Sequence, residues 1–514
     1  MPDLPPVMRS GRVARPVPTV VVVGAGIAGL CAALQLVTRG CAVTVLERAS
    51  EVGGKIRRNA AGAHVIDAGP TVFTLRELFE QIFQDAGSRL SEHLRLRPLE
   101  TLARHAWGAG ETLDLHADIA RSAAAIRTFA GAANEDGYVR FCADARRVYE
   151  TLDRSFLRAT APSLRGLVIG AGLRGLPNLW RLRAFRSLWS ALGDYFTDPR
   201  LLQLFGRYAT YCGSSPFKAP ATLMLVAHVE QSGVWQIDGG MHALASALRD
   251  LLTARGGLVR CDAEVRRIHM RSRRVRAVEL ANGEALHADA AIMTCDAAAV
   301  GAGLFGPEVA KVTARVGPAM RSLSALTWTA RAPSAGFALL RHNVFFSDDY
   351  DAEFDSILSK RQLPRRPTVY VCAQDREAAA SPADGEPERL MCLVNAPAIG
   401  DFHEYGSQEV ARCLMHTLAT LRRCGLRLPT APRHWLSTTP SDFHRLFPGS
   451  GGALYGQATH GWRASFRRPA ARTRIAGLYL AGGSTHPGPG LPMAALSGRH
   501  AVRCLLQDQG FISQ

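Results

Sequence analysis

The sequence predicts an α/β fold, in which a discontinuous Rossmann-like domain carries an inserted α+β domain and a helical region. Three observations predict it. A glycine-rich turn joins an apolar strand to a helix near the N-terminus, short alternating strands follow a helix in the middle of the chain, and a Gly/Pro-rich turn precedes the last helix. With 514 residues, of which 47% are hydrophobic and 20% charged, the chain can build two or three domains with ample core.

The N-terminal motif runs as a strand, a glycine turn, a helix and a second strand. Gly24 permits the tight turn, Gly26 lets the backbone approach a pyrophosphate, and Gly29 lets the helix pack closely on the sheet. Ala25 lies in the same turn and is counted among the expected nucleotide contacts. Glu47 ends the second strand, 18 residues after Gly29, where its carboxylate can accept both hydroxyls of an adenine-side ribose. A turn with a purely structural role is the alternative.

A second glycine pair, Gly53 and Gly54, follows the ribose-binding strand and precedes Lys55. The pattern E-R-x-x-x-x-G-G-K resembles the signature of flavoproteins in the amine oxidase and phytoene desaturase superfamily. In these proteins the loop helps to enclose an extended FAD, so the resemblance implies an FAD-binding domain. A surface turn is the alternative interpretation.

A middle segment, residues 234–294, is expected to add to the FAD-binding domain. It predicts a helix followed by short strands with a hairpin turn at Asn282-Gly283. The segment resembles the returning sheet of the superfamily, in which the strand beginning CDAEVRRI would lay Val265 against the adenine. A plain meander without ligand contact is the alternative.

The C-terminal segment, residues 477–498, predicts an apolar strand, a Gly/Pro-rich turn and the start of the helix 494–507. Residues without bulk, such as Gly483, allow the backbone to pack closely against a flat ring. The helix start near Met493 would point its free N–H groups and positive dipole end at the pyrimidine oxygens of the flavin.

Three motifs together resemble the carotenoid desaturases of the bacterial phytoene desaturase type. They are GAGIAGL with E-R-x-x-x-x-G-G-K, DAGPT at 67–71, and the C-terminal YLAGGSTHPGPGLPM, and the match covers most of the chain. The runs at 205–222 and 233–248 look most like the later-acting hydroxyneurosporene or methoxyneurosporene desaturases. The resemblance implies an FAD-dependent oxidoreductase of carotenoid biosynthesis that introduces a C-3,4 double bond into an acyclic 1-hydroxy- or 1-methoxy-carotenoid.

The C-terminal glycine motif departs from the pattern of many related FAD enzymes. Those enzymes carry an acid there for the ribitol or phosphate, whereas this chain has Gly483-Ser484. Ser484 is expected to act as a weaker partner. The missing acid also argues against an amine oxidase, as does the lack of a cysteine near the motif for covalent flavin attachment.

These motifs divide the chain into six predicted regions. The FAD-binding domain would use three of them, and the substrate would be held by the two regions between. The predicted regions are a flexible arm at 1–18, a first FAD-binding segment at 19–105, a helical substrate or membrane-facing region at 106–225, a second FAD-binding segment at 226–300, a substrate domain at 301–445 and a third FAD-binding segment at 446–514.

Removing two hydrogens from adjacent carbons of a hydrocarbon needs a hydride acceptor, which FAD provides. The resulting cation spreads along a neighbouring polyene, so a weak base suffices. The candidate catalytic base is His486 in the turn S-T-H-P-G, and its alternative role is a hydrogen bond to the turn backbone or a phosphate. Asp67 would orient the cofactor loop or cap a turn.

No metal is expected, because the eleven cysteines form no C-x-x-C pair and the histidines do not cluster at the spacing of metal ligands. The cysteines instead resemble small core residues in a reducing compartment. The apolar stretch 19–37 contains the three spaced glycines and is not interpreted as a membrane span.

The formal net charge is +17, and part of it gathers between residues 160 and 190. Five arginines and two tryptophans interleave there without Asp or Glu, which favours a helix in the headgroup layer of a membrane. A solvated basic face is the alternative, and no recognition motif supports nucleic acid. The chain is therefore expected in the cytoplasm, peripherally associated with the inner membrane. The residues are Arg165, Arg174, Arg181, Arg183, Arg186, Trp180 and Trp189.

Other activities share the expected fold. A phytoene desaturase would differ in substrate and number of steps, and a carotenoid cis–trans isomerase would be redox-neutral. Prenyl-protein escort proteins have the same fold without catalysis, but the intact glycines and Glu47 disfavour them. Oxygen and quinone both remain open as the terminal electron acceptor.

Overall fold

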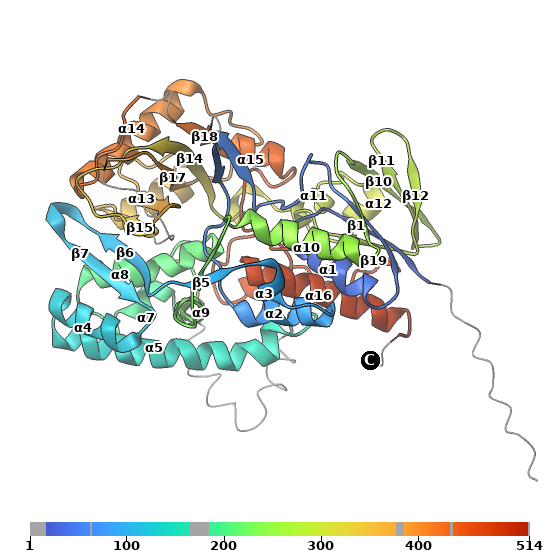
Figure 1. Cartoon of the computed structure of the whole chain (residues 1–514), viewed down its shortest axis with the longest axis horizontal. Helices are drawn as coiled ribbons and strands as arrows, with labels where there is room; N and C mark the ends of the chain where they lie inside the picture. Colours follow the sequence, from blue (N-terminus) through green and yellow to red (C-terminus); the bar gives the residue numbers. More distant parts are fainter. Residues whose placement is uncertain (1–16, 62–63, 164–184, 377–384, 432–434, 512–514) are drawn as a thin grey trace, which may run out of the picture.

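The computed structural model places two sheets side by side above a layer of helices (Figure 1). The nucleotide-binding sheet and its helices occupy one half of the molecule, and a larger sheet occupies the other. The structure describes residues 17–61, 64–163, 185–376, 385–431 and 435–511.

The nucleotide-binding sheet has five parallel strands in the order β19-β13-β1-β2-β9. Its central strand, β1, reads TVVVV and is almost entirely buried, as expected for a parallel strand covered on both faces. Each of the three predicted FAD-binding segments supplies at least one strand, so the discontinuous Rossmann-like fold is confirmed. The strands are β1 (Thr19–Val23), β2 (Ala42–Leu46), β9 (Leu258–Arg260), β13 (Ala290–Met293) and β19 (Leu478–Leu480).

Three helices cover one face of this sheet and lie next to one another (Figure 1). The helix after the first glycine turn packs so closely on the last helix that a Cβ at Gly498 would lie 2.4 Å from the carbonyl oxygen of Ala28. The segments at the two ends of the chain therefore share one core. The helices are α1 (Ile27–Val37), α10 (His242–Ala254) and α16 (Leu491–Asp508), with α2 (Arg76–Asp85) and α3 (Leu90–His93) beside them.

A small antiparallel sheet projects from the nucleotide-binding half (Figure 1). Its second turn is the predicted Asn282-Gly283 hairpin, and Gly283 has the positive φ of 88° that such a turn requires. The elements are β10 (Val265–Arg271), β11 (Arg274–Leu280) and β12 (Ala285–His287), followed after β13 by α11 (Ala297–Gly301) and α12 (Pro307–Ala310).

The larger sheet has seven strands in the order β18-β14-β17-β16-β15-β6-β7. Most of it comes from the predicted substrate domain, but β6 lies across the predicted boundary at residue 105 and pairs with β15. The strands are β6 (Thr101–Ala106), β7 (Thr112–His116), β14 (Ser324–Ala332), β15 (His342–Phe345), β16 (Val369–Ala373), β17 (Glu388–Ala396) and β18 (Leu436–Thr438). The helices around it are α13 (Tyr350–Leu358), α14 (Ser407–Arg423) and α15 (Pro440–Leu446).

Two short strand pairs and several short helices connect these layers. The pairs are β3 (Arg58–Ala61) with β4 (His64–Asp67), and β5 (Leu96–Pro98) with β8 (Trp235–Ile237). The short helices are η1 (Gly108–Gly110), η5 (Pro318–Met320) and η7 (Ala464–Arg467).

The predicted helical region lies beneath the larger sheet and shares with it a core of aromatic and aliphatic side chains (Figure 1). Most of the basic and tryptophan-containing stretch at 160–190 lies outside the described residues, which include its Arg186 and Trp189. The elements are α4 (Ile119–Ala130), α5 (Ala132–Leu152), the π-helical turn η2 (Asp153–Leu157), α7 (Leu188–Leu192), α8 (Pro199–Gly206), η3 (Arg207–Cys212) and η4 (Ala221–Met224). The helix α9 (Leu225–Gln231) packs with them on α5, η3 and η4, so the helical region extends past its predicted end at residue 225.

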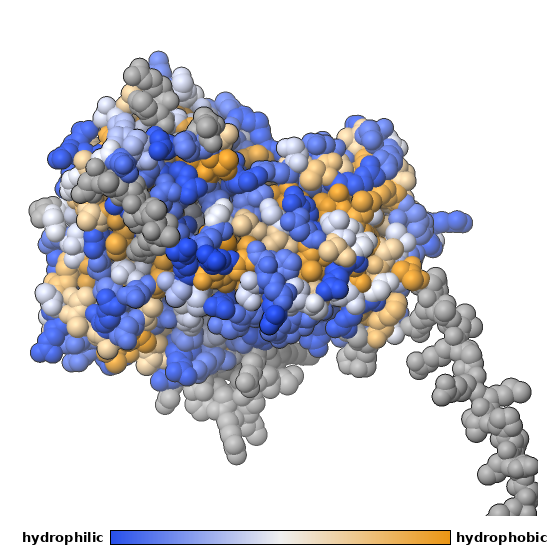
Figure 2. Space-filling model, in the orientation of Figure 1, coloured by the Kyte–Doolittle hydropathy of each residue, from blue (hydrophilic) through white to orange (hydrophobic). Residues whose placement is uncertain are grey.

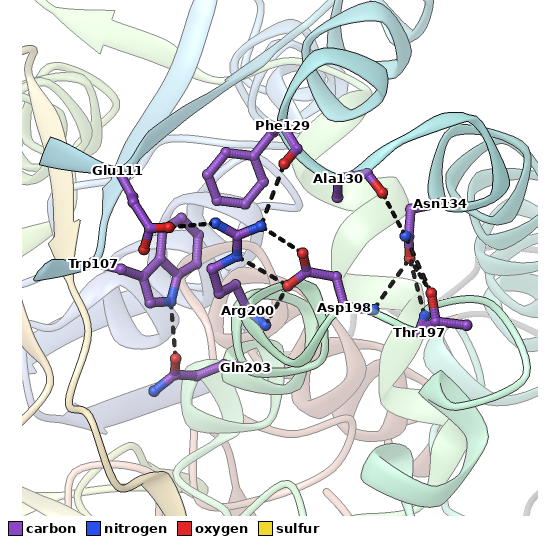
Figure 3. Close-up of polar contacts among 9 residues, drawn as sticks. All are labelled: Trp107, Glu111, Phe129, Ala130, Asn134, Thr197, Asp198, Arg200 and Gln203. Carbon is purple, nitrogen blue, oxygen red and sulfur yellow. Dashed lines mark hydrogen bonds and ion pairs between the residues drawn. The ribbon is translucent and has the colours of Figure 1, made fainter. Parts of the chain in front are cut away.

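Polar contacts fix the start of α8 to the α4–α5 turn and to the larger sheet (Figure 3). The Arg200 guanidinium pairs with Asp198 at 2.6 Å and with Glu111 at 2.7 Å, and it lies 3.9 Å from the Phe129 ring centroid. The buried Asn134 accepts a hydrogen bond from the Thr197 N–H at 2.9 Å. These contacts hold α8 in place, and η3 follows it directly toward the cavity described below.

On the face of the molecule shown in Figure 2, hydrophilic and hydrophobic residues are interspersed. No helix within the described ranges is long and apolar enough to cross a membrane.

Candidate active site

A cavity of about 1320 Å³ lies where the nucleotide-binding sheet, the larger sheet and the helical region meet. One half is lined by the two glycine turns and the C-terminal motif, and the other by aliphatic and aromatic side chains. The volume exceeds the usual range for a single drug-sized ligand. A cofactor and a second, apolar molecule can therefore share it.

The three glycines of the first turn have different surroundings. A Cβ at Gly24 would lie 2.6 Å from Thr294 Oγ1, and one at Gly29 would lie 2.0 Å from the Gly24 carbonyl oxygen. These two positions need glycine for packing. Gly26 has φ −73°, and a Cβ there would have no neighbour closer than 4.0 Å. Since neither conformation nor packing demands glycine at position 26, its open side is suited to close approach by a ligand.

The second glycine pair lies against the first turn. The Gly53 N–H donates to the Ala25 carbonyl oxygen at 2.9 Å, and Gly53 and Gly54 have positive φ angles of 120° and 58°. Lys55 lines the cavity and donates from Nζ to the Leu454 carbonyl oxygen at 2.6 Å. Burial lowers the pKa of the Lys55 ammonium.

Glu47 and Val265 line the far end of the same half of the cavity. Glu47 accepts hydrogen bonds from the N–H groups of Ala25, at 2.8 Å, and Ala49, at 2.9 Å. These bonds fix the carboxylate at the carboxyl end of β2, and its remaining lone pairs can accept from a ligand. The buried Val265 supplies an apolar surface beside it.

The C-terminal motif closes the opposite side with Gly483, Ser484 and Met493. Ser484 Oγ accepts from the Ala297 N–H at 2.9 Å, so part of its hydrogen-bonding capacity is used within the protein. The helix α16 begins at Leu491, two residues before the predicted start near Met493, and its first N–H groups lie at the cavity wall.

Two residues at this side were not found by sequence reasoning. Asp296 caps α11 through Oδ1, while its buried Oδ2 has no partner within the described structure although the residue lines the cavity. Arg468 donates to the carbonyl oxygens of Tyr455, Gln457 and Gly483, and burial lowers its pKa to about 10. Neither position belongs to a recognisable motif, so no sequence signal identified them.

These observations test whether FAD fits. The open side of Gly26 accommodates a pyrophosphate, the N-terminus of α1 favours negative charge, and the unpartnered Asp296 Oδ2 can accept from a ribitol hydroxyl. Asp296 thus places a carboxylate beside the C-terminal motif, which has no acid of its own. The cavity residues therefore fit FAD.

Asp67 is expected either to orient the cofactor loop or to cap a turn, and the structure gives it a capping role. Its Oδ2 accepts from the Met241 N–H at 2.7 Å, at the start of α10, and burial raises its pKa. The carboxylate thereby holds the DAGPT segment against α10.

His486 is buried next to the C-terminal turn but is not among the residues lining the cavity. Its Nε2 lies 2.9 Å from the carbonyl oxygens of both Phe156 and Ala159, so Nε2 carries the proton and donates. Burial, with a smaller contribution from His500, lowers its pKa to about 4. The placement supports the alternative of a backbone hydrogen bond rather than proton removal from a molecule in the cavity.

The second half of the cavity is apolar and aromatic, with two charged residues from the helical region. Phe156, Phe466 and leucines of η4 and α9 form its wall. The two charged residues are Arg207 and Glu230.

All eleven cysteines lie within the described residues and none forms a disulfide, and eight of them are buried. In the part of the chain that the structure describes, no three His, Cys, Asp or Glu side chains gather as a metal site.

Comparison with known proteins gives a consistent family. A model of the flavin containing amine oxidoreductase family matches residues 27–506. Hydroxyneurosporene desaturase from Rubrivivax gelatinosus is 51% identical over 488 residues, covering 95% of this chain and 93% of that protein. The enzyme of the same name from Cereibacter sphaeroides is 44% identical, covering 96% of this chain and 98% of that protein.

More distant proteins share the architecture. The 4,4'-diapolycopene oxygenase of Methylomonas sp is 28% identical and covers 93% of this chain and 96% of that protein. Putrescine oxidase bound to putrescine superposes with a TM-score of 0.61 at 14% identity, covering 95% of this chain and 99% of that one. Cyclohexylamine oxidase from Brevibacterium oxydans IH-35A superposes with a TM-score of 0.56 at 16% identity, covering 96% of this chain and 100% of that one. These two solved structures establish the fold.

Gly26→Ala and Gly29→Ala form a matched pair. We expect Gly26→Ala to weaken FAD binding at least roughly 10-fold, because the new methyl group enters the cavity, while the thermal midpoint without FAD stays unchanged. Gly29→Ala should instead destabilise the protein itself by about 1–3 kcal/mol through the clash with Gly24. FAD titration and thermal unfolding measure both effects. Wild-type FAD affinity in Gly26→Ala would contradict the assignment.

His486 predicts a pH dependence of stability. Its pKa is about 4 in the folded protein against an ordinary 6.5, so between these values the unfolded chain binds the extra proton. The stabilisation is present above pH 6.5 and is lost as the pH falls to about 4. From this group alone we expect the free energy of unfolding to fall by up to about 3 kcal/mol over this pH range. His486→Asn should show a flatter dependence in unfolding measured from pH 7 to pH 4, and equal slopes for both proteins would refute the prediction.

Proposed function

The chain belongs to the flavin containing amine oxidoreductase family, in its carotenoid desaturase branch, and we propose that it introduces the C-3,4 double bond of acyclic 1-hydroxy- or 1-methoxy-carotenoids. It is an FAD-dependent oxidoreductase. The observation that carries the proposal is one cavity in which a nucleotide cradle continues into an apolar, aromatic half. A carotenoid needs such a wall, and a desaturation needs it next to the cofactor.

Bound FAD supplies the hydride acceptor for the reaction. The chain's own residues would bind and orient it. Gly24 and Gly26 would receive the pyrophosphate, and Glu47 would accept from the ribose hydroxyls. The predicted contacts Ala25 and Gly29 do not line the cavity, and they would act by shaping the turn. The other proposed contacts are Val265 at the adenine, Gly53, Gly54 and Lys55 along the extended cofactor, and Gly483, Ser484, Asp296 and Met493 around the flavin and ribitol.

The apolar half of the cavity would align the polyene and exclude water. Phe156 packs edge-on against Phe466, with ring centroids 5.3 Å apart, and against His486 at 4.8 Å. In this arrangement His486 positions the aromatic wall through η2, since it donates to the Phe156 carbonyl oxygen of that turn and to the Ala159 carbonyl oxygen just after it. We therefore propose a positioning role for His486 in place of catalysis.

Phytoene desaturation and carotenoid isomerisation are the competing activities. The similar relatives at 42–51% identity are all named hydroxyneurosporene desaturases, which favours the late desaturation. Fold alone would not separate the three reactions.

The decisive experiment incubates the purified, FAD-loaded protein in lipid with 1-hydroxyneurosporene and, separately, with phytoene, under oxygen or with an added quinone. We expect loss of two hydrogens by mass and a red-shifted polyene band with the hydroxylated substrate. Conversion of phytoene instead would move the enzyme to the start of the pathway. A product of unchanged mass formed anaerobically would indicate an isomerase.

We also propose that the cavity opens toward a membrane surface. Phe185 is 77% exposed and packs on Trp462 with ring centroids 5.3 Å apart, and both residues line the cavity. Arg463 lies 4.8 Å from the Trp462 ring and is exposed, as is Arg467. An exposed phenyl ring packed on a partly buried tryptophan and flanked by cations suits the interface of an anionic bilayer, from which a carotenoid could enter without crossing water.

Vesicle flotation tests this surface. We expect the protein to float with vesicles containing anionic lipid, and Phe185→Ser/Trp462→Ser to weaken the association. Phe402→Ser is the matched control, since Phe402 is 58% exposed but does not line the cavity. Equal flotation of all three proteins would exclude this surface as the membrane contact. Absence of flotation both with and without anionic lipid would exclude it as well.

A further inference from the structure

A buried polar cluster projects into the apolar half of the cavity. It comprises Arg207 on η3, Glu230 on α9, Tyr211 and Tyr370, which line the cavity, and Tyr208, which does not line it but donates to Glu230. Among the described residues that line the cavity, Arg207 and Glu230 are the charged ones that the helical region contributes. Their neighbours in the wall include Leu223, Leu225, Val226 and Val229. A charged pair in such a wall costs free energy unless it has partners.

The hydrogen bonds leave one group of donors available. Glu230 accepts from the hydroxyls of Tyr208, at 2.5 Å, and Tyr211, at 3.1 Å. Arg207 Nη1 donates to the Tyr211 hydroxyl at 3.2 Å, which is the one hydrogen bond that its guanidinium makes within the described structure. A guanidinium has five N–H donors. Since Arg207 lines the cavity, its remaining donors can meet a ligand there.

The guanidinium is held in position from two sides. It lies 5.1 Å from the ring centroid of Tyr211 and 5.6 Å from that of Tyr370. The Tyr370 hydroxyl lies 2.7 Å from His342 Nδ1 and 2.6 Å from Thr71 Oγ1. Thr71 belongs to the DAGPT segment, which also lines the cavity. The cluster is thereby tied to the wall of the cofactor half.

We propose that the free N–H donors of Arg207 bind the oxygen at C-1 of the carotenoid end group. This inference rests on the proposed function, and it identifies the residue that would select oxygenated substrates. A tertiary hydroxyl and a methoxyl group both accept hydrogen bonds, so one donor site serves both. The oxygen at C-1 is three bonds from C-3, so its binding site must adjoin the reacting carbons, as a cluster tied to the cofactor half does.

The cluster also accounts for rejection of hydrocarbon ends. A carotenoid with hydrogen in place of oxygen at C-1 would shield the Arg207 donors from water without accepting hydrogen bonds from them, which is unfavourable in an apolar site. Glu230 balances the charge of Arg207, and the Tyr211 hydroxyl bridges the two side chains. Specificity would therefore depend on the cation, with Glu230 as its positioning partner.

The test compares 1-hydroxyneurosporene with a carotenoid that has the same polyene and hydrogen at C-1, using the FAD-loaded enzyme in lipid. For Arg207→Leu we expect kcat/KM with the hydroxylated substrate to fall roughly 10- to 150-fold, and the preference over the deoxygenated substrate to disappear. Arg207→Lys should retain part of the preference. Arg249→Leu, an exposed arginine of α10 outside the cavity, is the matched control and should behave as wild type.

A second variant protects the test against misfolding. Arg207→Leu leaves Glu230 without its neighbouring cation, whereas Arg207→Leu/Glu230→Gln removes both charges and should also lose the preference. FAD content and the thermal midpoint report folding. An unchanged preference in either folded variant, or an equal loss with both substrates, would overturn the role of Arg207. A wild-type enzyme without any preference for the hydroxylated substrate would instead overturn the proposed function.

Discussion

The structure depends on the close backbone approach of three distant segments at the carboxyl end of β1. Gly24 lies against Thr294, Gly29 lies against Gly24, and Gly498 of the last helix lies against Ala28 of the first. A methyl group at Gly29 or Gly498 would lie 2.0 Å or 2.4 Å from a backbone carbonyl oxygen, and one at Gly24 would lie 2.6 Å from the Thr294 hydroxyl, so none of the three contacts has room for it. The cavity therefore forms only when the N-terminal, middle and C-terminal segments are all in place, and cofactor binding is coupled to the folding of the whole chain.

This coupling explains which parts of the molecule could be predicted from the sequence. The nucleotide half is built from backbone, so glycine spacing and an apolar strand are sufficient signals, and Glu47 follows from its place at the end of β2. Asp296 carried no signal because its free oxygen matters only through the meeting of β13 with the C-terminal turn. Arg207 and Glu230 lie in stretches without a motif, and the Tyr211 hydroxyl links them only because η3 packs on α9. The membrane-facing stretch was predicted from composition, and most of it lies outside the described residues.

The two halves of the cavity solve different physical problems. The nucleotide half offers main-chain N–H groups, a helix N-terminus and fixed carboxylates to a charged cofactor, which would lose hydration on entering. The second half offers aromatic and aliphatic surface to a molecule that carries almost no polar atoms. Arg207 and Glu230 form a cluster at which the second half becomes polar again, and Tyr370 and Thr71 connect that cluster to the cofactor side. A ligand with a hydrocarbon body and one oxygen near its end matches this sequence of surfaces.

The ionisable groups near the reaction space are mostly committed to protein partners. His486 donates to two carbonyl oxygens and Glu230 accepts from two tyrosines, while burial lowers the pKa of His486 and raises that of Glu230. Such groups are poorly placed to take a proton from a substrate, but they hold neighbouring segments at fixed distances. Removal of hydrogen beside a polyene needs little acid–base assistance, because the charge that develops is spread over the conjugated chain. The protein's contribution is then placement and exclusion of water, and the residue that distinguishes one carotenoid from another is the one whose donors remain free.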